Sequence, residues 1–296
     1  MQAPESETTG PGTPATEPGV SLAPPPRSPD HTWPARQRLA VRDVAAGAGL
    51  WRLALTLGWF DIRLRYRGSI LGPFWLTLST AVMVAALGVL YSALFKMELH
   101  DYLPFLAISL VLWNTLAAIV SEAVTCFLQA EGMIRAARMP FSLYAARVMV
   151  RNIIVLGHNI VVIAAVYLWF DTWPGTAALG AIPGLLLWIV DGVAACLLLG
   201  TVCARFRDIP PIVASLMQIA FFISPIIWKP ELLTGDKRAL LPLNPFYTLL
   251  EVVRGPLLGA APASVVWVSA LIWSGLLLLA AWVLFVRVRN RLAFWV

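Results

Sequence analysis

The stretch RLRYRGSILGPFWLTLSTAVMVAALGVLYSALF, residues Arg63 to Phe95, decides the fold, because an arginine-rich segment runs directly into a hydrophobic one. From Gly72-Pro73 to Leu94 there is no charged residue. At a helical rise of about 1.5 Å per residue, such a segment crosses a hydrocarbon core of about 30 Å. Positive charge beside a span holds that end in the cytoplasm, so the sequence predicts a first transmembrane helix that leads outward.

The composition of the whole chain is that of a polytopic membrane protein. Of its 296 residues, 59% are hydrophobic and 13% are charged, against about 25% charged in soluble proteins, and the mean hydropathy is +0.77. The basic residues cluster at the ends of the expected spans, which favours topology and lipid headgroups over nucleic acid as the cause of the net charge of +6. Cys126, Cys196 and Cys203 are too few and too scattered for a disulfide framework or a metal site, so we expect core packing.

The chain before the first span divides into two parts. Residues 1–35 are rich in Pro, Gly, Ser, Thr and Glu and resemble no signal peptide, which predicts a disordered cytoplasmic tail. Residues 36–67 are amphipathic, and about Leu50 to Tyr66 we expect a helix in the inner headgroup region with its arginines on the phosphates of membrane lipids. A plain juxtamembrane helix that only anchors the first span fits the pattern equally well. The side chains of interest are Trp59, Arg63, Arg65 and Arg67.

Five more spans are expected after the first, and each is a long apolar segment with few charges. They cover about residues 103–128, 148–170, 177–204, 210–228 and 263–286. Pro183 predicts a kink in the fourth of them, whereas Pro210-Pro211 suits the first turn of the fifth. The expected fold is therefore all-α, with six transmembrane helices in residues 68–296.

The distribution of positive charge supports this topology. With six spans and both termini in the cytoplasm, most of the 22 Lys and Arg residues fall on the cytoplasmic side. The basic residues left outside are Lys96, Lys229, Lys237, Arg238 and Arg254. An odd number of spans would destroy this asymmetry.

Two inner loops and one outer segment stand out between the spans. The first inner loop, Gln129 to Leu143, is short and mixed in charge, and either a partner-docking helix that uses Met133, Ile134 and Met139 or a simple turn fits it. The second, at residues 205–211, is a charged turn that contains Arg205, Arg207 and Asp208. The outer segment 229–262 is too polar to span and too apolar for an ordinary loop, which indicates short re-entrant helices that line or close a pathway.

Ionisable and amide side chains inside the spans have two interpretations. Glu122, His158 and Asp191, with Asn152 and Asn159, are either contacts along a pathway through the membrane or hydrogen-bonding groups between helices, and we favour the second for His158. An enzymatic function is an alternative to a pathway through the membrane: a membrane-embedded acyl- or glycosyltransferase would use these groups as acids and bases. Their dispersal over three spans argues against it.

Several motifs, in order, carry a family resemblance. They are RYRGSILGPFW, EGMIRAARMPFSLYAARVMVRN, RFRDIPPIVASLMQ followed by SPIIW, and NPFYTLLEVVRGPLLG. Together they resemble the permease subunits of ABC-type polysaccharide exporters, which carry lipid-linked O-antigen, capsule or teichoic-acid-type polymers out of the bacterial cytoplasm. The resemblance covers about Asp61 to Val296 and implies a type-2 ABC exporter permease in the inner membrane.

The resemblance also implies roles for particular residues. The interface helix would guide the lipid-linked substrate, and spans one and five would line the pore of a homodimer. The ATPase-coupling loop would comprise Glu131, Gly132, Met133, Ile134, Arg135 and Arg138. The outer gate would comprise Pro242, Asn244, Pro245, Phe246, Tyr247, Glu251 and Arg254.

The chain itself lacks the means to bind ATP through a P-loop. That motif needs a Gly-Lys pair to cradle phosphate, and no such pair occurs in the sequence. We therefore expect this chain to bind no cofactor or metal of its own. Two partner ATPase subunits would bind ATP and Mg.

Overall fold

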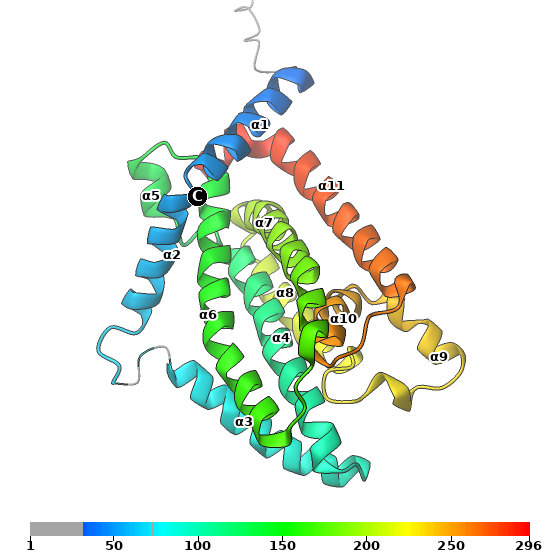
Figure 1. Ribbon diagram of the computed structural model, residues 1–296. Coiled ribbons are helices and arrows are strands. Elements are labelled where there is room, and N and C mark those ends of the chain that lie inside the picture. The colour runs from blue at the N-terminus through cyan, green and yellow to red at the C-terminus, as the bar shows by residue number, and fades with distance from the viewer. Residues whose placement is uncertain (1–31, 71, 73) are drawn as a thin grey trace, which may run out of the picture.

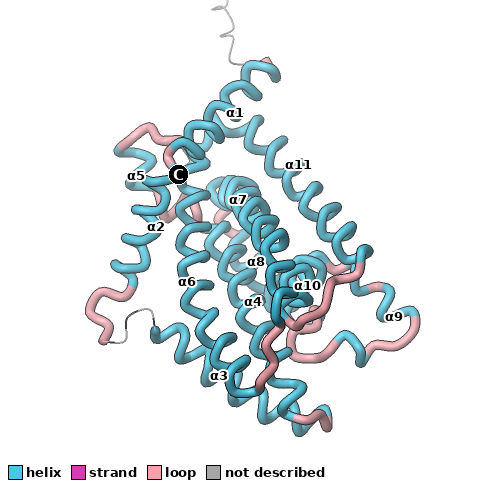
Figure 2. The backbone as a smooth tube through the Cα atoms, in the orientation of Figure 1, coloured by secondary structure: helices cyan, strands magenta, loops and turns pink. Residues whose placement is uncertain are grey.

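The computed structural model describes residues 32–70, 72 and 74–296, and every regular element in that part of the chain is helical (Figure 1, Figure 2). The α-helices are α1 (Trp33–Gly49), α2 (Trp51–Arg65), α3 (Phe74–Phe95), α4 (Leu99–Thr125), α5 (Glu131–Ala136), α6 (Phe141–Phe170), α7 (Ala181–Arg205), α8 (Ile209–Ile223), α9 (Asp236–Ala239), α10 (Pro245–Leu257) and α11 (Ser264–Trp295). Short 3-10 turns are η2 (Gly175–Gly180), η3 (Pro230–Leu232) and η4 (Leu241–Leu243).

The predicted all-α membrane architecture is confirmed. Within the described residues, five helices are long and apolar enough to cross a membrane, namely α3, α4, α6, α7 together with η2, and α11. The N-terminal tail predicted for residues 1–35 lies mostly outside the described part of the chain, and α1 already begins at Trp33. The predicted start of the first span at Gly72-Pro73 also falls partly outside it, because Pro73 is not described.

The predicted fifth span is too long, and this is a correction to the sequence analysis. α8 has 15 residues and ends at Ile223, whereas we expected helix to residue 228. At about 1.5 Å per residue it covers about 22 Å, short of a hydrocarbon core of about 30 Å. The cause is the Ser224-Pro225 pair: a residue before proline disfavours helical geometry, and Ser224 is extended at φ −82° and ψ 143°.

The predicted kink at Pro183 is also wrong. α7 begins at Ala181, so Pro183 lies in its first turn, where no intrahelical hydrogen bond needs the missing N–H.

α4 is the central column of the bundle. In its most apolar 18 residues, 78% are buried, against 17% for α3 and 22% for α11. It packs against α3, α6, α7 and α8, and the main hydrophobic core forms around Leu106, Ile108 and Leu112. α3, α8 and α11 therefore lie on the periphery, and their apolar side chains face outward.

Glycines allow several helices to approach closely. A Cβ at Gly58 would lie 2.6 Å from a methyl of Val150, so α2 sits directly on α6. A Cβ at Gly184 would lie 3.0 Å from the carbonyl oxygen of Val252, which brings α7 equally close to α10. Small residues at crossings are typical of packing inside membranes, where backbones must meet closely to gain van der Waals contact.

The helix ends separate into two groups (Figure 1). α1, α5 and the C-terminus gather at one end, which we call the α5 end. There the backbone N–H groups of Phe141 and Ser142 donate to the carboxylate of Asp43, and Arg289 pairs with the same carboxylate at 2.8 Å. The turns α3–α4 and α6–α7 lie at the opposite end.

Candidate functional site: a clamped interface helix, a polar cavity and an outer helix

An ion-pair cluster fastens α2 to α6. Arg147 of α6 donates from Nε to Asp61 Oδ2 at 2.6 Å and from Nη2 to Asp61 Oδ1 at 2.5 Å. Arg151, one turn further along α6, donates from Nη1 to the same carboxylate at 3.1 Å. A bidentate arginine contact is strong and directional, and here it joins two helices at a site that water reaches little. The cluster therefore fixes both the position and the rotation of α2.

Glu122 of α4 extends this cluster across the bundle. Its carboxylate accepts from Arg151 Nε at 2.8 Å and from Asn152 Nδ2 at 2.7 Å, and it receives a longer contact of 3.2 Å from Arg65. The sequence placed Glu122 among dispersed polar groups, and the structure brings it together with Asn152, Arg151 and Arg65. Periodicity alone gave no sign of this, because Glu122 lies on α4 and its partners lie on α2 and α6.

A cavity of about 290 Å³ opens beside the cluster, between α3, α4 and α6. Its polar lining consists of Arg65, Ser79, Thr80, Asn114, Thr115, Glu122, Asn152 and Asn159. Asn159 is buried and its Oδ1 has no hydrogen-bond partner, while Arg65 is about half exposed at the cluster. The cavity can therefore accept a polar group at membrane depth, because its lining offers both hydrogen-bond donors and hydrogen-bond acceptors.

Of the four residues predicted at the interface helix, Arg65 reaches Glu122, whereas the other three face away from the bundle. Trp59 is 54% exposed, and Arg63 and Arg67 are exposed as well. Ala54, Gly58 and Ile62 form the buried side of α2. The exposed side of α2 therefore carries large apolar side chains such as Trp59 and Leu64 together with arginines, while a narrow strip of small and apolar residues lies against α6.

The first inner loop forms the short helix α5, and none of its residues is fully buried. Gly132, Arg135 and Arg138 are exposed, whereas Met133 and Ile134 pack partly onto the core of the same chain. Arg135 pairs with Glu131 at 2.7 Å and donates to the carbonyl oxygen of Val296 at 2.8 Å. A partner protein would therefore meet mainly the polar face of α5.

The second inner loop presents Arg205, Arg207 and Asp208 at the surface. The Arg205 guanidinium lies 5.9 Å from the ring of Trp295 and 5.5 Å from that of Phe206. The loop is thus held near the C-terminus by cation–π contact while its two other charged side chains stay exposed.

Asn244 caps the start of α10, which lies in the segment predicted to be on the outer side. Its Oδ1 accepts from the backbone N–H of Phe246 at 2.9 Å and of Tyr247 at 3.3 Å, and its Nδ2 donates to Ser224 Oγ at 2.9 Å. Pro245 follows as the first helical residue, a position that proline favours. Pro242, just before, accepts a hydrogen bond from Ser269 of α11. The NPFY motif is therefore an N-cap that also ties α10 to the end of α8.

Arg254 is buried, although the sequence analysis counted it among the outer cations. It is 1% exposed, pairs with Glu251, and donates from Nη1 to the Pro225 carbonyl at 2.5 Å and to Ser109 Oγ at 3.0 Å. Its guanidinium also lies 4.7 Å from the ring of Phe105. The i, i+3 spacing of Glu251 and Arg254 was the one sign in the sequence of this arrangement.

The remaining intramembrane groups stay apart. His158 Nδ1 lies 2.8 Å from the Ile154 carbonyl of its own helix, so its polar contact stays within α6. Asp191 accepts from Ser274. Cys126, Cys196 and Cys203 are buried free thiols, and the described residues contain no cluster of His, Cys, Asp and Glu that could hold a metal ion.

Comparison with known proteins identifies the family. The sequence matches the ABC-2 type transporter family over residues 52–258. It is 20% identical over 235 residues to the O-antigen export system permease protein RfbA of Myxococcus xanthus, covering 75% of this chain and 89% of that protein. It is 18% identical over 195 residues to the protein of the same name from Klebsiella pneumoniae, covering 64% and 74%. Because the family match covers more than half of the sequence, from α2 through α10, this multi-pass membrane protein belongs to the ABC-2 type transporter family.

Proposed function

We propose that the protein is the membrane-spanning permease subunit of an ATP-driven exporter that moves lipid-linked polysaccharide out of the bacterial cytoplasm. The observation that carries the proposal is the similarity to the Myxococcus xanthus O-antigen export permease over 89% of that protein's length. The helical bundle with its clamped interface helix and outer helix α10 is consistent with it.

The α5 end is the cytoplasmic end in this proposal, and the membrane is the inner membrane. A homodimer of the chain works with two ATPase subunits, which bind the ATP and Mg that drive transport. Gly132, Arg135 and Arg138 are exposed on α5 and its following turn, as a docking surface requires. This chain then contributes no cofactor site of its own.

The substrate meets the protein at α2 and at the polar cavity. Exposed Arg63 and Arg67 suit the phosphate groups of a carrier lipid, since guanidinium groups bind phosphate through paired hydrogen bonds. The amide and hydroxyl groups of Ser79, Thr80 and Asn114 in the cavity suit sugar hydroxyls. A transferase has no comparable support, because Glu122, His158 and Asp191 lie in three separate environments.

Purification of the full chain from membranes with a co-expressed candidate ATPase tests the proposal. We expect a complex of two copies with two ATPase subunits, and ATPase activity that rises when lipid-linked polysaccharide is added. A chain that purifies alone from every co-expression, with no export defect after deletion of its gene, would contradict the proposal.

A further inference from the structure

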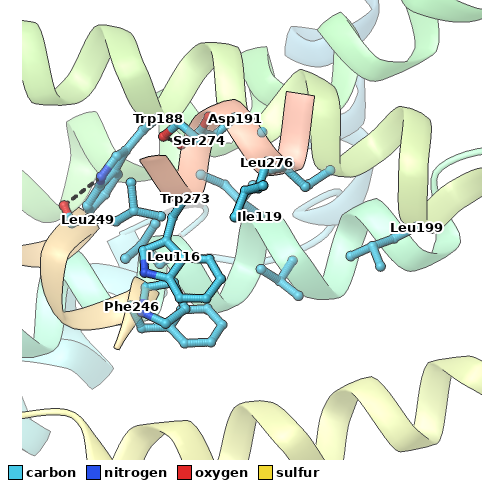
Figure 3. Close-up of a pocket in the computed structure, with 15 residues that line it drawn as sticks. Leu116, Ile119, Trp188, Asp191, Leu199, Phe246, Leu249, Trp273, Ser274 and Leu276 are labelled. Carbon is cyan, nitrogen blue, oxygen red and sulfur yellow. Dashed lines mark hydrogen bonds between the residues drawn. The ribbon is translucent and has the colours of Figure 1, made fainter. Parts of the chain in front are cut away.

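A second, apolar cavity lies apart from the polar cavity, between α4, α7, α10 and α11 (Figure 3). Its volume is about 420 Å³, within the range of small-molecule sites. The walls are almost wholly hydrocarbon and aromatic, with Leu116 and Ile119 from α4, Trp188 from α7, Phe246 from α10 and Trp273 from α11. An apolar ligand of moderate size would therefore fit between the four helices.

One carboxyl group breaks the apolar lining. Asp191 is 6% exposed and lies near the middle of α7, opposite Ser274 of α11. Its Oδ2 accepts a hydrogen bond from Ser274 Oγ at 2.7 Å, whereas its buried Oδ1 has no partner. Buried polar atoms are nearly always hydrogen-bonded, because desolvation without a partner is costly. Asp191 is one of the residues that line this ligand-sized cavity, so its buried, unpartnered oxygen indicates a missing polar group at this position.

The cavity is open on one side, beside α11. Leu276 in its wall is 52% exposed, while Phe246 and Trp273 are partly exposed at the surface. Since α7 and α11 are both long enough to cross the bilayer, this flank lies at membrane depth. An occupant would therefore enter from the hydrocarbon phase and must itself be largely apolar.

We propose that this cavity is a binding site for a lipophilic amine, with the nitrogen on Asp191 Oδ1 and the hydrocarbon part against Leu116, Ile119 and Trp273. An amine satisfies this oxygen in either form, because ammonium with carboxylate and amine with carboxylic acid are the same hydrogen-bonded pair with the proton moved. A fatty acid would place two acids together, and an alcohol would leave any charge on Asp191 uncompensated at a depth where charge is unfavourable.

The site would connect the bundle to the outer helix. Phe246 and Leu249 of α10 form part of its wall, and Trp188 Nε1 donates to the Leu249 carbonyl at 2.8 Å. A bound amine would thus touch α7, α11 and α10 at once. The bound amine would stabilise the observed arrangement of α10. This effect does not depend on which substrate the protein transports.

The test is equilibrium dialysis of the purified full-length chain in an uncharged maltoside detergent with radiolabelled dodecylamine. We expect one saturable site per chain beyond uptake by empty micelles, displaced by unlabelled dodecylamine and far less by dodecanol or dodecanoate. Asp191→Asn should weaken binding at least about tenfold. Asp171→Asn makes the same substitution in an exposed turn beyond α6 and should leave binding unchanged.

Two further variants keep the test decisive if Asp191→Asn does not fold. Leu276→Trp fills the exposed opening without disturbing a buried side chain, so binding should be lost while thermal unfolding stays the same. Ser274→Ala frees the second carboxyl oxygen, so binding should be kept or strengthened. Equal binding to Leu276→Trp and wild type, equal displacement by dodecanol, or uptake that matches empty micelles would each overturn the proposal.

Discussion

Arg147 and Asp61 join α6 to α2 through two parallel hydrogen bonds of 2.6 and 2.5 Å, although 86 residues separate them in the sequence. Arg151 shares the same carboxylate at 3.1 Å. Removal of the acid therefore leaves two partly buried guanidinium groups with reduced compensation. This one carboxylate therefore links α2 to two side chains of α6.

The first prediction concerns that carboxylate. Asp61→Asn should lower the free energy of unfolding by about 1–3 kcal/mol, because charged donors are left partly unsatisfied. Hydrogen exchange in α2 should rise more than in α4, which does not depend on Asp61. Thermal unfolding and exchange measured by mass spectrometry check both effects.

Glu131→Gln is the matched control. Glu131 pairs with Arg135 at 2.7 Å, but both side chains are about half exposed or more, so the change should have little effect on stability. Equal loss of stability in the two variants would show that the pair of Asp61 with Arg147 has no special role.

A second prediction concerns the contact between α2 and α6. Gly58→Ala places a methyl group 2.6 Å from a methyl of Val150 and 3.2 Å from the Arg147 carbonyl, so α2 must move away. We expect a loss of about 1–3 kcal/mol from overpacking. Gly157→Ala in α6 meets no atom within 4 Å and should stabilise the helix by up to about 1 kcal/mol. Thermal unfolding of the two variants should therefore shift in opposite directions.

A third prediction concerns the buried arginine of the outer segment. Arg254→Met leaves Glu251 without its ion pair and the Pro225 carbonyl without its donor. Loss of one partner of a buried ion pair costs about 3–5 kcal/mol, so the variant should unfold earlier or accumulate poorly in membranes. The exposed Arg238 provides the control, since Arg238→Met should leave stability unchanged. Similar accumulation and thermal unfolding of the two variants would contradict the role of Arg254 as a buried partner of Glu251 and the Pro225 carbonyl.

A fourth prediction concerns the docking of an ATPase on α5. Arg138→Glu changes an exposed side chain, so ATPase activity coupled to transport should fall while membrane insertion and thermal unfolding stay normal. Arg135→Glu should reduce coupling too, and it should also loosen the C-terminus because Arg135 donates to the Val296 carbonyl. Normal turnover in the double variant would count against α5 as the coupling element.

The long spans could be predicted from the sequence because hydropathy measures the property that places a helix in a membrane. α3, α4, α6, α7 and α11 all appear where apolar runs occur. The end of α8 was missed because its apolar character continues through Ile226 and Ile227, while Pro225 ends the helix. Hydropathy measures solvent preference, whereas backbone geometry decides where a helix stops.

The polar core could not be predicted in the same way. A hydropathy profile counts Arg254 as a charge and assigns it to the surface, yet it is enclosed by Glu251, Ser109 and the Pro225 carbonyl. Glu122 likewise finds its partners only when α2, α4 and α6 come together. Such groups depend on contacts between distant segments, which no local pattern encodes.

The attachment of α2 to α6 gives the interface helix a mechanical role. α5 lies four residues before the start of α6, and the ion pairs of Arg147 and Arg151 hold α2 to the first half of that same helix. α5 and the attachment point of α2 therefore both lie at the same end of α6. If an ATPase docks on α5 as proposed, a displacement of α5 that tilts α6 would move α2 with it, because the ion pairs of Arg147 and Arg151 join the two helices.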